Sequence, residues 1–431
     1  MYKVKKLKNN LTLITIPVKG TEATTVMVMV PIGSRYETAR LSGVSHFIEH
    51  MVFKGTKKRP HSLNISEELE AEGADYNAFT GKDYTSFYVK IAAKEQERAY
   101  DILSDMLFNS EFKAEDLDKE RGVITEELRM YEDNPTMAID ALFDSLIFGD
   151  HPLGWEIGGT VKTVKEVARE ELQGYYRAAY RPENMVLVVA GKIEEVKLKK
   201  FLKYFTNIER TTSTKKILNA KNYLSFKWPK QLPALKERVK VSTRKVDQSH
   251  LILGFPGLSN NHPDRYAQAL MLRILGGGMS SRLFQEVRVK RGLAYMIGAG
   301  TSSFRETGTV QVQAGLDSKR LAEALAVIKT ELERLTKELV SVKELQDSKT
   351  NFTGRFSLAM EDSSSQADWF ARQFWFAPKM ETHQDVLKKI NRVTREDIKR
   401  VAKKLLVWDK LHVALVGPTT KEELIKALPK V

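Results

Sequence analysis

Hydrophobic and polar positions alternate in several short runs of the first half of the chain, which is the pattern of β-strands with one buried face. The expected strands are residues 11–16, 25–30, 75–80 and 85–91. Longer runs repeat their apolar positions every three or four residues, the period of an α-helix. The expected helices are residues 42–54, 94–109 and 114–132. The last helix should end at Asn134-Pro135, because the residue before a proline avoids helical backbone angles.

The second half of the chain repeats part of the first. Residues 169–191 and 395–417 align at an offset of 226 without a gap, and residues 26–31 and 251–256 align at an offset of 225. A period this long is not that of a solenoid, and it indicates a duplicated domain. We therefore expect an α+β protein of two homologous domains, each a mostly antiparallel sheet covered by helices. The expected division is a first domain at 1–210, a charged, proline-containing linker at 211–236 and a second domain at 237–431.

The composition is that of a globular protein, since 42% of the 431 residues are hydrophobic and 29% are charged. The chain has no cysteine, which excludes disulfides, thiolate metal sites and cysteine nucleophiles. No run approaches the roughly 18 apolar residues of a membrane span. The N-terminus lacks the apolar core and cleavage site of a signal peptide. We expect a cytoplasmic protein without a membrane partner.

The net charge of +14 at pH 7 raises the question of a nucleic-acid partner. The lysines, however, are spread along the whole chain, often beside glutamates on expected helix faces. The sequence shows no basic arm, zinc-knuckle spacing or aromatic RNA-binding stripe. We expect a solvated basic surface and no nucleic-acid partner, although the charge could also attract acidic peptides.

One expected helix carries residues suited to metal chemistry. His46, Glu49 and His50 lie at i, i+3 and i+4, so they share one face of the helix. Two imidazoles one turn apart can both reach a single Zn²⁺, and a glutamate beside the second one can accept a proton from the attacking water. The alternative is a pair of surface histidines on an ordinary helix.

A catalytic zinc site needs a third protein ligand. The expected helix at 114–132 contains Glu120 and Glu127, which are seven positions apart and share a face. Four acidic side chains of this stretch could serve as the ligand, so spacing alone does not choose Glu127.

These residues belong to four longer motifs. They are Gly43-Val44-Ser45-His46-Phe47-Ile48-Glu49-His50-Met51-Val52-Phe53-Lys54-Gly55-Thr56, Asn77-Ala78-Phe79-Thr80, Glu120-Arg121-Gly122-Val123-Ile124 with Glu127, and Arg288-Val289-Lys290-Arg291-Gly292-Leu293-Ala294-Tyr295. Over almost the whole chain the sequence resembles the M16 metallopeptidases, the insulinase or pitrilysin group, which are also called inverzincins. Its length is similar to that of a compact subgroup that includes bacterial relatives of the mitochondrial processing peptidase.

The resemblance implies a role for each residue of the first half. It implies one Zn²⁺ per chain, held by His46, His50 and Glu127, with Glu49 as the general base. Glu120 would then orient a histidine ligand.

The second half keeps the repeat but not the metal motif. At the offset of 225, the positions of the two histidines and the intervening glutamate hold Met271, Ile274 and Leu275, which can pack but cannot bind zinc. This half does contain Arg288 and Tyr295. The resemblance implies that they act on the substrate from an opposing domain, where the arginine would hold a carbonyl and the tyrosine would donate to the oxyanion. The alternative is that both are ordinary helix and strand residues.

Asn77, Ala78 and Phe79 lie in an expected strand close to the metal motif. If this strand is an exposed edge, a substrate peptide can add to it as a further strand. The alternative is a closed core strand.

Together these observations predict a zinc metalloendopeptidase that hydrolyses unstructured oligopeptides inside a clamshell chamber. A homodimer would suffice, because the metal motif and the Arg288–Tyr295 pair occur in one chain. The alternatives are a catalytic or structural subunit of a heteromeric M16 peptidase and, less favoured, a nucleic-acid-binding protein.

Overall fold

The computed structural model describes residues 2–208 and 218–430. Residues 211–217, the first part of the expected linker, lie outside the described residues. The chain divides into two compact units, each of which draws on both halves of the sequence. Unit 1 contains Met1–Arg129, Trp155–Leu224 and Ser357–Met380, and unit 2 contains Met130–Gly154, Ser225–Phe356 and Glu381–Val431.

Unit 1 is built on a six-stranded sheet with the order β1-β2-β6-β3-β5-β4. Neighbouring strands are antiparallel except β2 and β6, which are parallel. β4 is therefore the last strand on one side of the sheet. The strands are β1 (Lys3–Lys6), β2 (Thr12–Pro17), β3 (Ala23–Val30), β4 (Asp75–Thr80), β5 (Thr85–Ala92) and β6 (Val186–Gly191).

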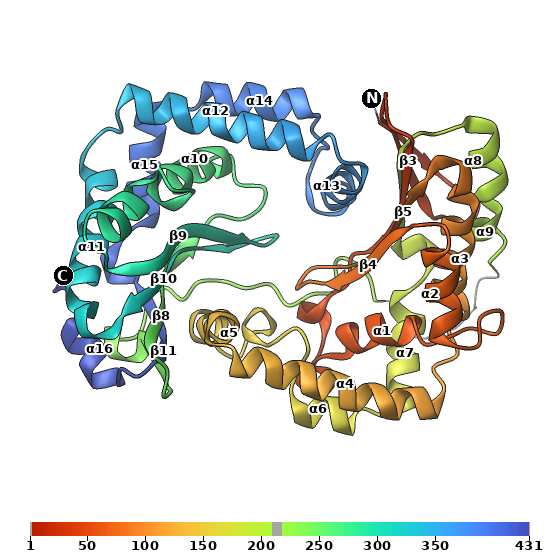
Figure 1. Cartoon of the computed structure of the whole chain (residues 1–431), viewed down its shortest axis with the longest axis horizontal. Helices are drawn as coiled ribbons and strands as arrows, with labels where there is room; N and C mark the ends of the chain where they lie inside the picture. Colours follow the sequence, from red (N-terminus) through yellow and green to blue (C-terminus); the bar gives the residue numbers. More distant parts are fainter. Residues whose placement is uncertain (1, 209–217, 431) are drawn as a thin grey trace. The chain divides into compact units, whose positions relative to one another are not determined.

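Helices cover both faces of this sheet (Figure 1). The larger core lies between the sheet and helices that include α1, which carries the metal motif. On the other face, Ala367, Phe370 and Ala371 of α13 pack against β2, β3 and β6. The helices of unit 1 are α1 (Val44–Val52), α2 (Ser62–Glu70), α3 (Gln96–Asn109), α4 (Ala114–Asp133), α6 (Val161–Glu166), α7 (Arg169–Ala179), α8 (Glu195–Phe201), α9 (Lys203–Thr206) and α13 (Ser363–Phe376), with α4 running on into unit 2.

Unit 2 is built on a five-stranded sheet with the order β7-β11-β8-β10-β9. Only β7 and β11 are parallel. The order and the directions are the same as in β2-β6-β3-β5-β4 of unit 1, which confirms the duplicated, mostly antiparallel α+β fold expected from the repeat. The strands are β7 (Val239–Thr243), β8 (Gln248–Gly257), β9 (Ala294–Ser303), β10 (Gly308–Asp317) and β11 (His412–Gly417).

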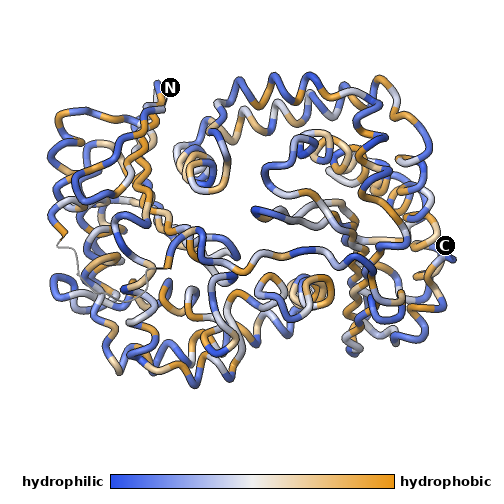
Figure 2. Tube along the Cα trace, turned by 180° about the vertical axis from the view of Figure 1, so that it is seen from behind, coloured by the Kyte–Doolittle hydropathy of each residue, from blue (hydrophilic) through white to orange (hydrophobic). Residues whose placement is uncertain are grey.

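One face of the unit 2 sheet is covered by α5 (Pro135–Phe148), a helix that Figure 2 shows as mostly hydrophobic. Phe143 of α5 fits against Gly254 of β8 so closely that a Cβ atom at Gly254 would lie 2.0 Å from the phenyl ring. The glycine therefore makes room for the helix. The other helices of unit 2 are α10 (Arg265–Gly276), α11 (Leu321–Lys337), α12 (Val342–Ala359), which runs on into unit 1, α14 (His383–Arg392), α15 (Arg395–Leu405) and α16 (Lys421–Ala427).

The elements expected from periodicity are all present, with ends that differ by no more than two residues. α4 ends before Asn134-Pro135, as expected, and Pro135 begins α5, since a proline is favourable at the first position of a helix. None of the helices in residues 2–208 and 218–430 is long and apolar enough to cross a membrane.

Candidate metal centre

Helix α1 presents one apolar and one polar face. Val44, Phe47, Ile48, Met51 and Val52 are at most 2% exposed and pack into the core of unit 1. The helix is fixed at its N-terminus by Glu37, whose carboxylate accepts hydrogen bonds from the backbone N–H groups of Gly43 at 2.7 Å and Ser45 at 2.8 Å. Helix N-termini stabilise negative charge in this way. The buried face and the fixed end together determine where the polar face points.

On that polar face the structure brings His46 and His50 together with Glu127 of α4. The Glu127 Oε2 atom lies 3.7 Å from Nε2 of His46 and 3.4 Å from Nε2 of His50. One ligand atom from each residue lies within 4.8 Å of the others. Ligands about 2.0–2.1 Å from a tetrahedral Zn²⁺ are about 3.4 Å apart, and both nitrogen–oxygen distances are close to this value. Of the acidic side chains that the sequence left open, Glu127 is the one in this group.

Glu120 holds His50 from the side away from Glu127. Its Oε2 atom lies 2.9 Å from Nδ1 of His50, and its Oε1 atom lies 2.5 Å from Nζ of Lys54. Burial alone would raise the pKa of Glu120, but the hydrogen bonds of His50 and Lys54 lower it below 4.5. Burial disfavours the charged His50 imidazole, yet the hydrogen bonds and charges of Glu120 and Glu127 raise its pKa to about 9. A bond from Nδ1 to a carboxylate orients Nε2 for a metal.

His46 has the opposite electrostatic setting. Burial and the neighbouring His50 lower its pKa to about 4, so its imidazole is neutral near pH 7, the form that binds a metal. Gly158 lies against it, since a Cβ at that position would be 3.6 Å from Nδ1 of His46 and 2.9 Å from the Leu128 side chain.

Glu49 lies beside the ligand group without being part of it. Its Oε2 atom accepts a hydrogen bond of 2.5 Å from Oγ1 of Thr80. Burial raises the pKa of Glu49 above 4.5, and the Thr80 bond opposes that shift. A carboxylate whose pKa is raised toward the working pH is suited to act as a general base.

Asn77, Ala78 and Phe79 lie on β4, which pairs with β5 on one side and is the last strand of its sheet. Ala78 faces the core at 9% exposure, whereas Phe79 is 36% exposed. In the described part of the chain no strand pairs with the outer edge of β4. That edge has the backbone geometry to accept a further strand.

Arg288 and Tyr295 come together on unit 2. The Arg288 guanidinium lies 5.2 Å from the centre of the Tyr295 ring and 4.8 Å from that of Phe284. Arg288 is the penultimate residue of the π-helical turn η7 (Phe284–Val289), and Tyr295 is the second residue of β9. Tyr295 is 73% exposed, so its hydroxyl is accessible to a ligand.

Four residues of this site received no role from the sequence. Two of them had a signal in the sequence. Lys54 follows His50 by four positions, the spacing of neighbours on one helix face, and Thr80 is the last residue of the motif that begins at Asn77. Glu37 and Gly158 had no such signal, because their partners are distant along the chain or are backbone atoms.

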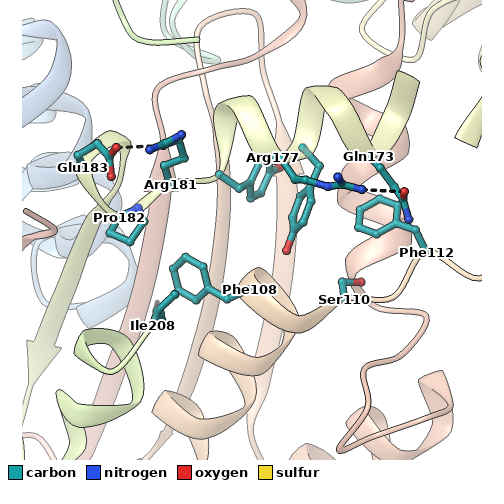
Figure 3. Close-up of a pocket in the computed structure, with 11 residues that line it drawn as sticks. Phe108, Ser110, Phe112, Gln173, Arg177, Arg181, Pro182, Glu183 and Ile208 are labelled. Carbon is teal, nitrogen blue, oxygen red and sulfur yellow. Dashed lines mark hydrogen bonds and ion pairs between the residues drawn. The ribbon is translucent and has the colours of Figure 1, made fainter. Parts of the chain in front are cut away.

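A separate pocket of about 270 Å³ lies in unit 1 (Figure 3). Its walls include Phe108, Phe112 and polar side chains of α7. Arg177 donates to Gln173, and Arg181 is paired with Glu183. The candidate metal ligands are absent from its lining, which is Phe108, Ser110, Phe112, Gln173, Tyr176, Arg177, Tyr180, Arg181, Pro182, Glu183 and Ile208.

Two family models match successive parts of the chain, and curated relatives match most of its length. Residues 13–161 match the family model described as insulinase (peptidase family M16), and residues 166–352 match the model described as the peptidase M16 inactive domain. An uncharacterized zinc protease of Streptomyces coelicolor is 33% identical over 412 residues, covering 96% of this chain and 88% of the relative. An uncharacterized zinc protease of Bacillus subtilis is 32% identical over 395 residues, covering 91% and 92%.

Solved structures show the same fold. The crystal structure of a protease from Helicobacter pylori has a TM-score of 0.89 and 24% sequence identity, and the match covers 97% of this chain and 99% of that one. A putative M16-like peptidase from Alicyclobacillus acidocaldarius has a TM-score of 0.81 with 21% identity, over 96% and 98% of the two chains.

Proposed function

The chain belongs to peptidase family M16, and from this premise we propose that it is a zinc-dependent endopeptidase acting on unstructured oligopeptides. The observation that carries the proposal is the group of His46, His50 and Glu127, with Glu49 beside it on the helix that carries the two histidines. A bound Zn²⁺ would supply Lewis-acid polarisation of the scissile carbonyl and lower the pKa of water.

The protein's own residues would carry the proton. Glu49 accepts a proton from the attacking water as the water oxygen bonds to the carbonyl carbon. It then passes that proton to the amine nitrogen as the C–N bond breaks. Glu120 keeps the His50 ring in place during these steps. The outer edge of β4 binds the substrate backbone as an added strand, which requires an extended peptide.

The first experiment separates metal binding from catalysis. His50→Ala should lose zinc and activity, because a ligand is gone. Glu49→Gln should keep about one zinc per chain, as expected for a three-ligand site, and lose cleavage of a quenched peptide library. Glu126→Gln, on the exposed side of α4, is the matched control and should retain both. Equal zinc loss in Glu49→Gln and His50→Ala would contradict the roles given to these residues.

Substrate size gives a second test. Addition to an edge strand requires an extended backbone, so peptides of flexible sequence should be cut while native globular proteins stay intact. Mass spectrometry of mixed peptides and folded proteins measures this directly. Cuts within the rigid core of a stable folded protein would contradict the proposal.

We further propose that the protein acts as a homodimer, in which Arg288 and Tyr295 of one subunit serve the metal group of the other. Glu49→Gln and Tyr295→Phe chains, each nearly inactive alone, are mixed and allowed to exchange subunits. In a mixed dimer one site then carries both changes and the other carries neither. About a quarter of wild-type activity should return with random pairing of independent symmetric sites. No recovery, with exchange confirmed by mass spectrometry, would reject the arrangement.

A further inference from the structure

The hydroxyl of Thr80 is held directly against the carboxylate proposed to act as the base. Oγ1 of Thr80 donates to Oε2 of Glu49 at 2.5 Å, within the short range typical of a hydroxyl bonded to a charged oxygen. In the described part of the chain Thr80 is the sole hydrogen-bond partner of this carboxylate. The bond therefore occupies Oε2 and leaves Oε1 for proton transfer.

The position of Thr80 follows from the alternation of side chains along β4. Successive residues of a strand point to opposite faces. Ala78 is buried in the core that contains α1, whereas Phe79 contacts the Tyr84 ring at 5.8 Å between centroids. Thr80 lies on the same face as Ala78, two positions on, and so reaches Glu49 of α1.

The end of β4 is fixed by the segment that follows β3. Gly81 donates from its N–H to the Tyr84 carbonyl at 2.8 Å, and its own carbonyl accepts from Ser34 at 3.1 Å. Asp83, two residues after Gly81, forms a buried ion pair with Arg35 at 2.9 Å. Gly33 allows this approach, since a Cβ there would lie 2.2 Å from the Gly81 carbonyl oxygen.

We propose that Thr80 is a positioning residue that orients the Glu49 carboxylate, so that the strand offering its edge to the substrate also aligns the base. This inference rests on the proposed peptidase function. A carboxylate on a flexible side chain can rotate about its last bond, and a single fixed oxygen limits that rotation. The effect should appear in the chemical step, because the hydroxyl contacts the base.

Kinetics of two Thr80 variants test this role. Thr80→Val keeps the shape and removes the hydroxyl, and it should lower kcat about 10- to 100-fold, as expected for a lost hydrogen bond to a charged group. KM, zinc content and melting temperature should stay as in the wild type. Thr80→Ser keeps the hydroxyl and should recover most of kcat. Thr15→Val, the same exchange on β2, is the control and should not change kcat.

A binding measurement separates positioning of the base from contact with the substrate. The Glu49→Ala chain cannot complete the reaction, so the Kd of a fluorescent peptide can be measured by anisotropy. Adding Thr80→Val to that chain should leave the Kd unchanged, because the partner of Thr80 is already gone. A weaker Kd in the double variant would assign Thr80 to substrate binding and overturn the inference.

The remaining outcomes are equally distinct. Wild-type kcat in Thr80→Val, or a Thr80→Ser chain as slow as Thr80→Val, would overturn the positioning role while leaving the peptidase proposal intact. A zinc-loaded wild type that cleaves no peptide would instead remove the peptidase proposal, and the positioning role with it.

Discussion

Replacement of Glu120 by glutamine should weaken zinc binding while preserving the fold. Each carboxylate oxygen of Glu120 has its own donor, His50 Nδ1 at 2.9 Å and Lys54 Nζ at 2.5 Å. Glutamine offers one acceptor oxygen and an NH₂ group that only donates. A metal on Nε2 of His50 requires the proton on Nδ1, and in that tautomer glutamine can accept from His50 or from Lys54 but not from both.

The size of the effect follows from the burial of this carboxylate. The Glu120 side chain is 5% exposed, so solvent water cannot easily replace the lost acceptor. Removing the partner of a metal-binding histidine costs about 10- to 100-fold in affinity, or about 1.4–2.7 kcal/mol. Competition between the metal-free protein and a chromogenic chelator measures the zinc Kd, and a thermal melt of the metal-free chain checks the fold.

Glu126→Gln provides the matched control on the same helix. Glu126 is 69% exposed and pairs with Arg129 on the surface, so its replacement removes the same charge without touching the ligands. Its zinc Kd should equal that of the wild type. If Glu120→Gln also bound zinc like the wild type, or if both variants lost the same affinity, the orienting role of Glu120 would be wrong.

Three further substitutions test other positions of unit 1. Gly158→Ala should lower the free energy of unfolding, measured in urea, by about 1–3 kcal/mol through overpacking, because the new Cβ would lie 2.9 Å from a leucine methyl group. Gly174→Ala is the control and should not destabilise the protein, because the space around Gly174 is open. Arg59→Met should lower the free energy of unfolding by about 3–5 kcal/mol, because the Arg59 side chain is 1% exposed and pairs with three carboxylates. Arg98→Met is the control and should lower it by less than about 1 kcal/mol, because the Arg98 side chain is 41% exposed in its ion pair. Burial raises the pKa of Glu37 from 4.5 to about 7, so the folded protein keeps a proton that the unfolded chain releases between these values, and this group lowers the free energy of unfolding as the pH rises through that range. Glu37→Gln should remove this contribution, while those of other shifted groups such as His46 stay, so the difference between the wild-type and variant unfolding free energies, measured in urea, should change with pH across this range.

Local features of the structure could be predicted from the sequence because they depend on neighbours along the chain. The period of apolar positions placed α1 and the strand at 75–80 to within two residues. The i, i+3, i+4 spacing of His46, Glu49 and His50 put the three on one helix face, where the structure has them. The repeat also predicted a duplicated α+β domain, and the shared strand order of the two sheets confirms it.

Long-range pairings could not be predicted in this way. The apolar residues of a helix such as α5 or α13 do not show which sheet the helix will cover. In the structure α13 packs on β2, β3 and β6, and α5 packs on β8 and β11, so each sheet is covered by a helix from the other half of the sequence. The choice of Glu127 over other acidic residues of α4, and the bond between Thr80 and Glu49, likewise depend on the approach of elements distant in sequence.

The duplicated fold also explains why only one copy carries the metal group. Helix α10 occupies the place in unit 2 that α1 has in unit 1, since α10 packs beside β9 as α1 packs beside β4. Its Met271, Ile274 and Leu275 are 0%, 6% and 0% exposed, so the helix face that carries the candidate metal ligands in one copy is part of the core in the other. Histidines placed there would be buried polar groups without partners, which costs stability. A metal site on this helix would thus depend on whether one helix face is left open to solvent, and the fold is preserved in either case.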